Sequence, residues 1–216
     1  MIDLYCIPGY GTDKRFFKHL KLKHYKQHFI EWPEPERNDT LGAYADKIIA
    51  QIDTSNPFSL LGISLGGFLA VELSSKINPQ KVFVISSLKS SKEFPGYWAL
   101  FRWFGVSHFI NAKTVKVSKW LIEPIFGKMT KDDKKIMNQM IDDTPNNFTT
   151  WAPKAISKWK SNDHLTPFKK IIHIIGDKDL LYSKSKIKDC HLIKNGSHLM
   201  IFDRAAQIGK LIDSEG

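Results

Sequence analysis

The sequence predicts an α/β fold with about six mostly parallel strands and helices on both faces of the sheet. Short, nearly continuous apolar runs alternate with segments whose apolar residues recur at helical spacing, a pattern typical of a parallel sheet covered on both sides. The chain has 216 residues, of which 42% are hydrophobic and 25% charged. That length and composition predict one well-packed domain, with room for an insertion.

The first half of the chain contains four of the predicted strands. They lie at Ile2–Ile7, Lys26–Trp32, Phe58–Ile63 and Lys81–Ser86. Helices are expected near Lys14–Leu20, after the capping pair Asp39-Thr40, and over residues 65–76. The last of these helices has Leu65, Phe68, Leu69 and Leu73 at helical spacing. Strand and helix therefore alternate without interruption as far as residue 88.

The alternation breaks between residues 89 and 160. This segment contains five of the six tryptophans, and it has thirteen Lys and Arg against six Asp and Glu. Short helices are expected at 97–104, 114–126 and 130–142, separated by proline and glycine. We expect an insertion of helices over the carboxyl edge of the sheet, forming a lid with an apolar underside. Most of its aromatic side chains would pack the insertion onto the core, and the others would face a pocket.

Two more strands and a closing helix complete the pattern. The strand Ile171–Ile175 ends in Gly176-Asp177-Lys178-Asp179, and the strand Asp189–Lys194 ends in Asn195-Gly196-Ser197-His198. The apolar residues after Leu199 follow helical spacing and predict a closing helix. The predicted organisation is therefore a core made of residues 1–88 and 161–216, with residues 89–160 as a helical lid.

The turn between the third strand and its helix reads Gly62-Ile63-Ser64-Leu65-Gly66, a G-x-S-x-G motif followed by another glycine. Such a turn forces the serine into a strained backbone conformation that exposes its Oγ above the end of the strand. The glycines fit because strand and helix approach each other too closely for side chains. The alternative interpretation is a helix that Ser64 merely caps at its N-terminus.

Three residues follow the carboxyl ends of predicted parallel strands, namely Ser64, Asp179 and His198. Such residues face the same crevice. A serine needs a base within hydrogen-bond reach to become a nucleophile, and the base needs a third group to fix its tautomer. The alternative acid is Asp177, two residues away. Ser86 and Ser87 lack a glycine turn, and the other seven histidines do not directly follow the last strand.

The order Ser, Asp, His, together with G-x-S-x-G-G, G-x-x-D and G-x-H after successive strands, resembles the α/β-hydrolase fold superfamily. The resemblance covers nearly the whole chain except the lid, and the chain begins at what would be the superfamily's third strand. It implies that the backbone N–H groups of Tyr10 and Leu65 form an oxyanion hole. The loop that carries Tyr10 reads Pro8-Gly9-Tyr10, where the superfamily commonly has His-Gly.

The expected function is that of a serine hydrolase, a carboxylesterase- or thioesterase-like enzyme that works through an acyl-enzyme on Ser64. The aromatic lid favours a small-molecule ester or thioester with an apolar acyl or aromatic group as substrate. The alternatives are a C–C bond hydrolase or acyltransferase that uses the same three residues, and a non-catalytic binding module on the same scaffold. Neither a metal nor an organic cofactor is expected.

The composition limits the compartments and partners that we expect. No apolar stretch approaches the roughly 18 residues of a membrane span, and no signal peptide is recognisable, so cytoplasm is the expected location. Cys6 and Cys190 are expected to be reduced. The net charge is +10 without a nucleic-acid-binding motif, so nucleic acid is not an expected partner. A solvated basic surface is the favoured interpretation, and attraction to an anionic membrane surface or an acidic substrate carrier is the alternative.

Overall fold

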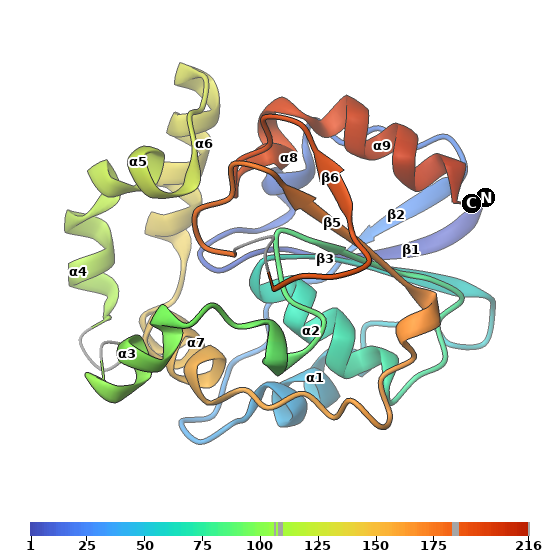
Figure 1. Cartoon of the computed structure of the whole chain (residues 1–216), viewed down its shortest axis with the longest axis horizontal. Helices are drawn as coiled ribbons and strands as arrows, with labels where there is room; N and C mark the ends of the chain where they lie inside the picture. Colours follow the sequence, from blue (N-terminus) through green and yellow to red (C-terminus); the bar gives the residue numbers. More distant parts are fainter. Residues whose placement is uncertain (106, 108–109, 183–185, 216) are drawn as a thin grey trace.

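The computed structural model describes residues 1–105, 107, 110–182 and 186–215, and a six-stranded sheet lies at its centre (Figure 1). The strands are β1 (Ile2–Ile7), β2 (Tyr25–Phe29), β3 (Phe58–Ile63), β4 (Val82–Ile85), β5 (Ile171–Gly176) and β6 (His191–Ile193). Their order in the sheet is β2-β1-β3-β4-β5-β6, and all five neighbouring pairs are parallel. The predicted fold class is confirmed, and the carboxyl ends of these six strands meet at one edge.

Helices cover both faces of the sheet, as predicted (Figure 1). On one face lie α1 (Leu41–Ile49), α2 (Leu65–Ser74) and α7 (Asn146–Lys158), and on the other lie the 3₁₀ turn η1 (Lys14–Phe17), α8 (Met200–Asp203) and α9 (Ala205–Ser214). Successive strand residues contribute to opposite cores, as β3 shows. Leu60 packs into the core under α2, whereas Leu61 and Ile63 pack into the core under α8 and α9.

The segment between β4 and β5 holds most of the remaining helices. After the 3₁₀ turn η2 (Ser91–Glu93) they are α3 (Tyr97–Trp103), α4 (Ala112–Val117), the 3₁₀ turn η4 (Lys119–Leu121), α5 (Ile122–Phe126) and α6 (Lys131–Asp143), followed by α7. The single helix predicted over 114–126 is wrong, because the chain forms three short pieces there. Pro124 lies in the first turn of α5, where its missing N–H is tolerated, but it could not continue a helix from α4.

Three other predictions differ from the structure. The helix expected near Lys14–Leu20 is only the 3₁₀ turn η1. The closing helix is divided into α8 and α9, because Arg204 leaves the helical backbone conformation with φ −119° and ψ 12°. Helix α7 was not predicted at all, since Pro153 reads as a helix breaker but lies inside it.

The two halves of the 89–160 segment pack differently. From α6 and α7 come large buried side chains, including Met140, Phe148 and Trp151, that belong to the two main cores. Helices α3, α4 and α5 lie farther out, at the end of the molecule away from both termini (Figure 1), and there Leu100, Trp103 and Trp120 are exposed. Among the described residues, no helix has both the length and the apolar character needed to span a bilayer.

The N-terminus of α2 packs very closely on the carboxyl ends of β1 and β3. A Cβ atom added to Gly66 would lie 2.1 Å from the carbonyl oxygen of Ile7 and 2.5 Å from that of Pro8. A Cβ atom added to Gly62 would lie 2.1 Å from the carbonyl oxygen of Gly66. Backbone atoms cannot yield at such distances, so only glycine fits at both positions. Ser64 occupies the turn between them.

We expect Gly66→Ala to lower the free energy of unfolding by more than about 3 kcal/mol, because the added methyl group overlaps two backbone carbonyls. Denaturant titration followed by circular dichroism measures the change. Gly96→Ala is the matched control, since a Cβ atom at Gly96 would meet nothing within 4 Å. Equal stability of the two variants would contradict this account of the turn.

Candidate active site

Ser64 has the backbone conformation that the sequence motif predicts. Its φ is 53° and its ψ is −115°, outside the regions that a residue with a side chain ordinarily occupies. Its N–H donates to the carbonyl of Ile85 on β4 at 2.9 Å, and its carbonyl accepts from the N–H of Gly67 at 2.9 Å. The Ser64 side chain makes no capping hydrogen bond to α2. The alternative role as a simple helix cap is therefore not what the structure shows.

The structure brings Ser64, Asp179 and His198 together from the ends of β3, β5 and β6. The Nε2 atom of His198 lies 3.0 Å from the Oγ of Ser64, and its Nδ1 lies 2.9 Å from the Oδ2 of Asp179. The imidazole is only 3% exposed. Because a carboxylate only accepts, Nδ1–H donates to Asp179, which leaves Nε2 free to accept the proton of the serine hydroxyl.

Asp179, rather than Asp177, is the carboxylate beside His198. Its second oxygen, Oδ1, accepts from the N–H groups of Leu181 at 2.8 Å and Tyr182 at 3.2 Å. These bonds fix the plane of the carboxylate. The Oδ1 of Asp177 is buried and has no hydrogen-bond partner in the described part of the chain. The two aspartates of the G-x-x-D turn thus differ in what they contact.

Ser87 and His173 support the serine turn, and the sequence analysis did not find them in this role. The hydroxyl of Ser87 donates to the carbonyl of Ser64 at 2.7 Å. The Nε2–H of His173 on β5 donates in turn to the carbonyl of Ser87 at 2.8 Å. Both side chains are buried. The local sequence gives no signal for these contacts, because they join residues of three different segments.

The loop after β1 passes directly beside Ser64. A Cβ atom added to Gly9 would lie 3.5 Å from the Cβ of Ser64. The next N–H along the chain is that of Tyr10, and Leu65 N–H begins α2 on the other side. Neither N–H donates to any other residue that the structure describes. Two free donors at the positive end of a helix dipole suit a developing negative charge.

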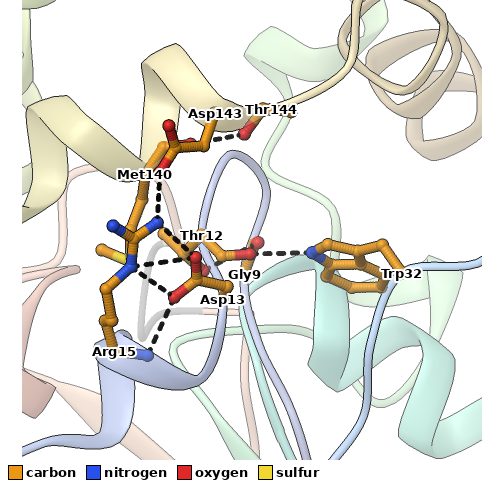
Figure 2. Close-up of polar contacts among 8 residues, drawn as sticks. All are labelled: Gly9, Thr12, Asp13, Arg15, Trp32, Met140, Asp143 and Thr144. Carbon is orange, nitrogen blue, oxygen red and sulfur yellow. Dashed lines mark hydrogen bonds and ion pairs between the residues drawn. The ribbon is translucent and has the colours of Figure 1, made fainter.

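Several hydrogen bonds hold this loop in place (Figure 2). The Oγ1 of Thr12 donates to the carbonyl of Gly9 at 2.8 Å, and the indole N–H of Trp32 donates to the carbonyl of Thr12 at 2.8 Å. Arg15 binds both Asp13 and Asp143, the latter at 2.6 Å at the end of α6. The guanidinium of Arg15 lowers the pKa of Asp13, whereas burial of Asp13 acts in the opposite direction as the largest single influence.

The side chain of Tyr10 joins the same loop to α7. Its hydroxyl donates to the carbonyl of Thr149 at 3.0 Å, and its ring stacks on Phe148. In a regular helix the Thr149 carbonyl would accept from the N–H of residue 153. That residue is Pro153, which has no N–H, so the carbonyl is free for Tyr10. Burial raises the pKa of Tyr10, and the hydroxyl therefore stays protonated as a donor at neutral pH.

Aromatic side chains from two segments enclose His198. The ring of Tyr182 lies 5.6 Å from the imidazole, and the ring of Phe126 at the end of α5 lies 5.5 Å from it. The N–H of Leu199 donates to the carbonyl of Phe126 at 3.0 Å. The 89–160 segment therefore contacts the loop of His198 through α5 and the loop of Tyr10 through α7.

Groups that could hold a metal are not part of this site. Across the described ranges, no three His, Cys, Asp or Glu side chains are grouped so that they could bind a metal ion. Cys6 is buried in the sheet and Cys190 is half-buried, and both are free thiols. Desolvation raises the pKa of both thiols, so at neutral pH they are protonated and poor nucleophiles.

No protein-family profile matches the chain, and no curated protein matches it in sequence. Solved structures do resemble it. A thermophilic esterase from Thermogutta terrifontis has a TM-score of 0.75 at 13% identity, covering 99% of this chain and 89% of its own. An enol-lactonase from Burkholderia xenovorans has a TM-score of 0.72 at 14% identity, covering 99% and 90%. An esterase from Exiguobacterium antarcticum has a TM-score of 0.71 at 13% identity, covering 100% and 91%.

The chain therefore has the α/β-hydrolase fold, as its sequence motifs imply. At these identities the likeness concerns the arrangement of the backbone and not the reaction. The role of each site residue has to be argued from this chain's own geometry.

We expect acid to destabilise the protein through His173. Burial lowers the pKa of its imidazole from 6.5 to about 4, since the ring is neutral and desolvated beside Ser87. Between these two values the unfolded chain binds a proton that the folded chain does not. Stability is thus present above pH 6.5 and is lost as the pH falls towards 4, by about 3 kcal/mol in total.

Chemical denaturation at a series of pH values measures this loss. His173→Gln keeps a side-chain N–H that can donate to the Ser87 carbonyl but does not titrate. The variant should have a flatter dependence on pH between 6.5 and 4 than the wild-type protein. Parallel curves for the two proteins would show that His173 is not the group responsible.

Proposed function

We propose that this protein is a serine hydrolase that cleaves a carboxylic ester or thioester, with Ser64 as nucleophile, His198 as general base and acid, and Asp179 as its orienting carboxylate. The observation that carries the proposal is the pair of hydrogen bonds of His198, at 3.0 Å to Ser64 and 2.9 Å to Asp179. This arrangement poises one imidazole to remove the hydroxyl proton while the buried carboxylate stabilises the resulting imidazolium.

The reaction has two halves. In the first, Oγ of Ser64 attacks the carbonyl carbon, its proton passes to Nε2 of His198, and the carbonyl electron pair moves to oxygen. Collapse of this intermediate expels the alcohol or thiol, which takes the proton from His198 and leaves an acyl group on Ser64. In the second half, water attacks the acyl-enzyme in the same way, which releases the carboxylic acid and returns the proton to Ser64.

The N–H groups of Tyr10 and Leu65 are the proposed oxyanion donors. Support comes from their position on either side of Ser64 and from the absence of an acceptor for either group among the described residues. Because the loop of Tyr10 is already fixed by Thr12, Trp32 and Thr149, the donors are preorganised and need not reorient during reaction. Preorganised donors of this kind typically contribute about 3 kcal/mol each to catalysis.

Aromatic rings around His198 favour an apolar acyl or aromatic substrate. The segment 89–160 is the proposed lid, since Phe126 and Tyr10 connect it to both sides of the site. The structural neighbours described above include two esterases and an enol-lactonase, which is compatible with a small ester-type substrate. C–C bond hydrolysis or acyl transfer by the same residues is the alternative chemistry, and a panel of substrates distinguishes them.

A fluorophosphonate probe should label the wild-type protein on Ser64, because the probe reacts with a hydroxyl that an adjacent base has activated. Ser64→Ala should abolish both labelling and ester hydrolysis. Gel fluorescence and mass spectrometry of the labelled peptide provide the measurement. An unlabelled wild-type protein would favour a binding module over an enzyme.

Two aspartate variants serve as a matched pair for this experiment. Asp179→Asn should lower kcat by about 10⁴-fold, because the amide favours the wrong histidine tautomer. Asp177→Asn, two residues earlier in the same turn, should change kcat by less than about tenfold, since Asp177 does not contact His198. Equal losses in the two variants would contradict the assignment of the acid.

We expect Tyr10→Phe to lower kcat by about tenfold with a smaller change in KM. The variant keeps the ring that stacks on Phe148 but loses the hydroxyl that donates to Thr149. The loop would then position the N–H group of residue 10 less precisely for the oxyanion. Steady-state kinetics with p-nitrophenyl esters provides both constants.

Tyr44→Phe is the control, because the Tyr44 hydroxyl also donates to a backbone carbonyl, that of Pro33 at 2.6 Å, but lies on α1 outside the loop. Tyr44→Phe should reduce stability and leave kcat nearly unchanged. If both variants lost activity in proportion to stability, Tyr10 would be a structural residue only.

A further inference from the structure

Helices α3, α4 and α5, with the residues next to them, expose a group of large apolar side chains. Trp103 is 85% exposed and Trp120 is 69% exposed. We call the whole group the outer apolar surface, and its members are Leu100, Trp103, Phe104, Val117, Trp120 and Ile125. Single exposed apolar residues are ordinary, but a run of them on successive helices is uncommon and marks an interaction site.

Apolar and basic side chains share one face of α4 and the following turn. Lys113 lies three and four residues before Lys116 and Val117, Trp120 lies four and three residues after them, and all four side chains are exposed. The helix packs against α6 and α7. Its outward face is therefore amphipathic, because exposed valine and tryptophan lie beside exposed lysines.

Three lysines next to this surface form no ion pair in the part of the chain that the structure describes. Lys113, Lys116 and Lys128 form no ion pair with any residue that the structure describes. By contrast, Lys119 binds Asp142 at 2.6 Å and Lys134 binds Glu123 at 2.5 Å, so those charges are already neutralised. The segment 89–160 carries thirteen Lys and Arg against six Asp and Glu. Unpaired positive charge thus lies beside exposed tryptophan.

We propose that the outer apolar surface, with Lys113, Lys116 and Lys128, is a docking surface for an anionic lipid bilayer. Tryptophan prefers the level of the lipid headgroups, where its ring is buried and its N–H still meets polar groups. Lysines at the same level are attracted to anionic headgroups. The two side-chain types together match the chemistry of that interface, since the tryptophans are exposed and the three lysines form no ion pair with the described residues.

A second copy of this chain is a poor occupant of the surface. Two copies that met through it would bring unpaired lysines of both together, and like charges in contact oppose association. An acidic protein would neutralise the lysine charges. Exposed aromatic and aliphatic side chains on three separate short helices, however, are better buried by a fluid lipid surface, which adapts its shape to them. The bilayer is therefore the occupant that both observations favour.

This docking would bring the bilayer close to the proposed active site. The last residue of α5 is Phe126, whose ring touches His198 and whose carbonyl accepts from Leu199. Ile125, immediately before it, belongs to the outer apolar surface. The inference goes beyond the proposed hydrolysis, because vesicle binding is measured without any turnover and can succeed or fail independently of it.

Cosedimentation with vesicles tests the proposal. The full chain should sediment with vesicles of phosphatidylglycerol and phosphatidylcholine in equal parts, but much less with phosphatidylcholine alone, and high salt should weaken the binding. Lys113→Gln with Lys116→Gln should weaken it by roughly tenfold or more. Lys21→Gln with Lys26→Gln is the control, since both lysines are exposed and form no ion pair with the described residues. Lys26 lies on β2 and Lys21 just before it, and β2 is on the opposite side of the molecule from α4 (Figure 1), so the control should change binding by less than about threefold.

Brominated lipids identify which tryptophans meet the bilayer. Vesicle binding should quench part of the wild-type tryptophan emission, and Trp103→Phe with Trp120→Phe should remove most of that quenching, because Trp151 and Trp159 are buried and Trp32 and Trp98 are partly buried. Circular dichroism verifies that the variants fold. The proposal is overturned if anionic vesicles do not bind the protein, if the control lysine pair matters as much as the α4 pair, or if the tryptophan variant is quenched as much as the wild-type protein. Failure of vesicle binding would leave an acidic protein as the partner to seek.

Discussion

The approach of α2 to the carboxyl ends of β1 and β3 is the constraint on which the site depends. Gly62 and Gly66 meet backbone atoms at distances that exclude any side chain, so the turn between them has little freedom. Ser64 takes a positive φ there, and its carbonyl is held by Gly67 and Ser87. The packing of α2 on the sheet thus holds Ser64 in a strained backbone conformation that exposes its hydroxyl.

The segment between β4 and β5 helps to hold the loop that carries Tyr10. In helix α7 the Thr149 carbonyl has no helical donor because residue 153 is proline, and it accepts from Tyr10 instead, so a residue that usually ends helices here leaves an acceptor for a contact between distant segments. Arg15 makes a second link, from the same loop to Asp143 at the end of α6 (Figure 2). The geometry of the proposed oxyanion donors therefore depends on residues far from Ser64 in the chain.

Sequence patterns predicted what depends on local order and missed what depends on tertiary contact. The convergence of Ser64, Asp179 and His198 was predictable because each follows the end of a strand, and parallel strands end at one edge. Ser87 has no local signal, since its role depends on the distance to the Ser64 carbonyl. Helix α7 was missed because propensity counts Pro153 as a breaker, whereas burial of Phe148 and Trp151 outweighs one lost hydrogen bond.

The unequal packing of the insertion limits how it could move. Helices α6 and α7 bury residues such as Met140 and Trp151 in the two cores, and releasing them would expose the largest apolar side chains of the segment. Helices α3 to α5 contribute far less to those cores and keep their tryptophans in contact with solvent. Moving α5 away from His198 would therefore require less free energy than moving α7. Helix α7 would keep its contact with Tyr10 in that case. Such a division would let one part of the insertion respond to its surroundings without disturbing the donors beside Ser64.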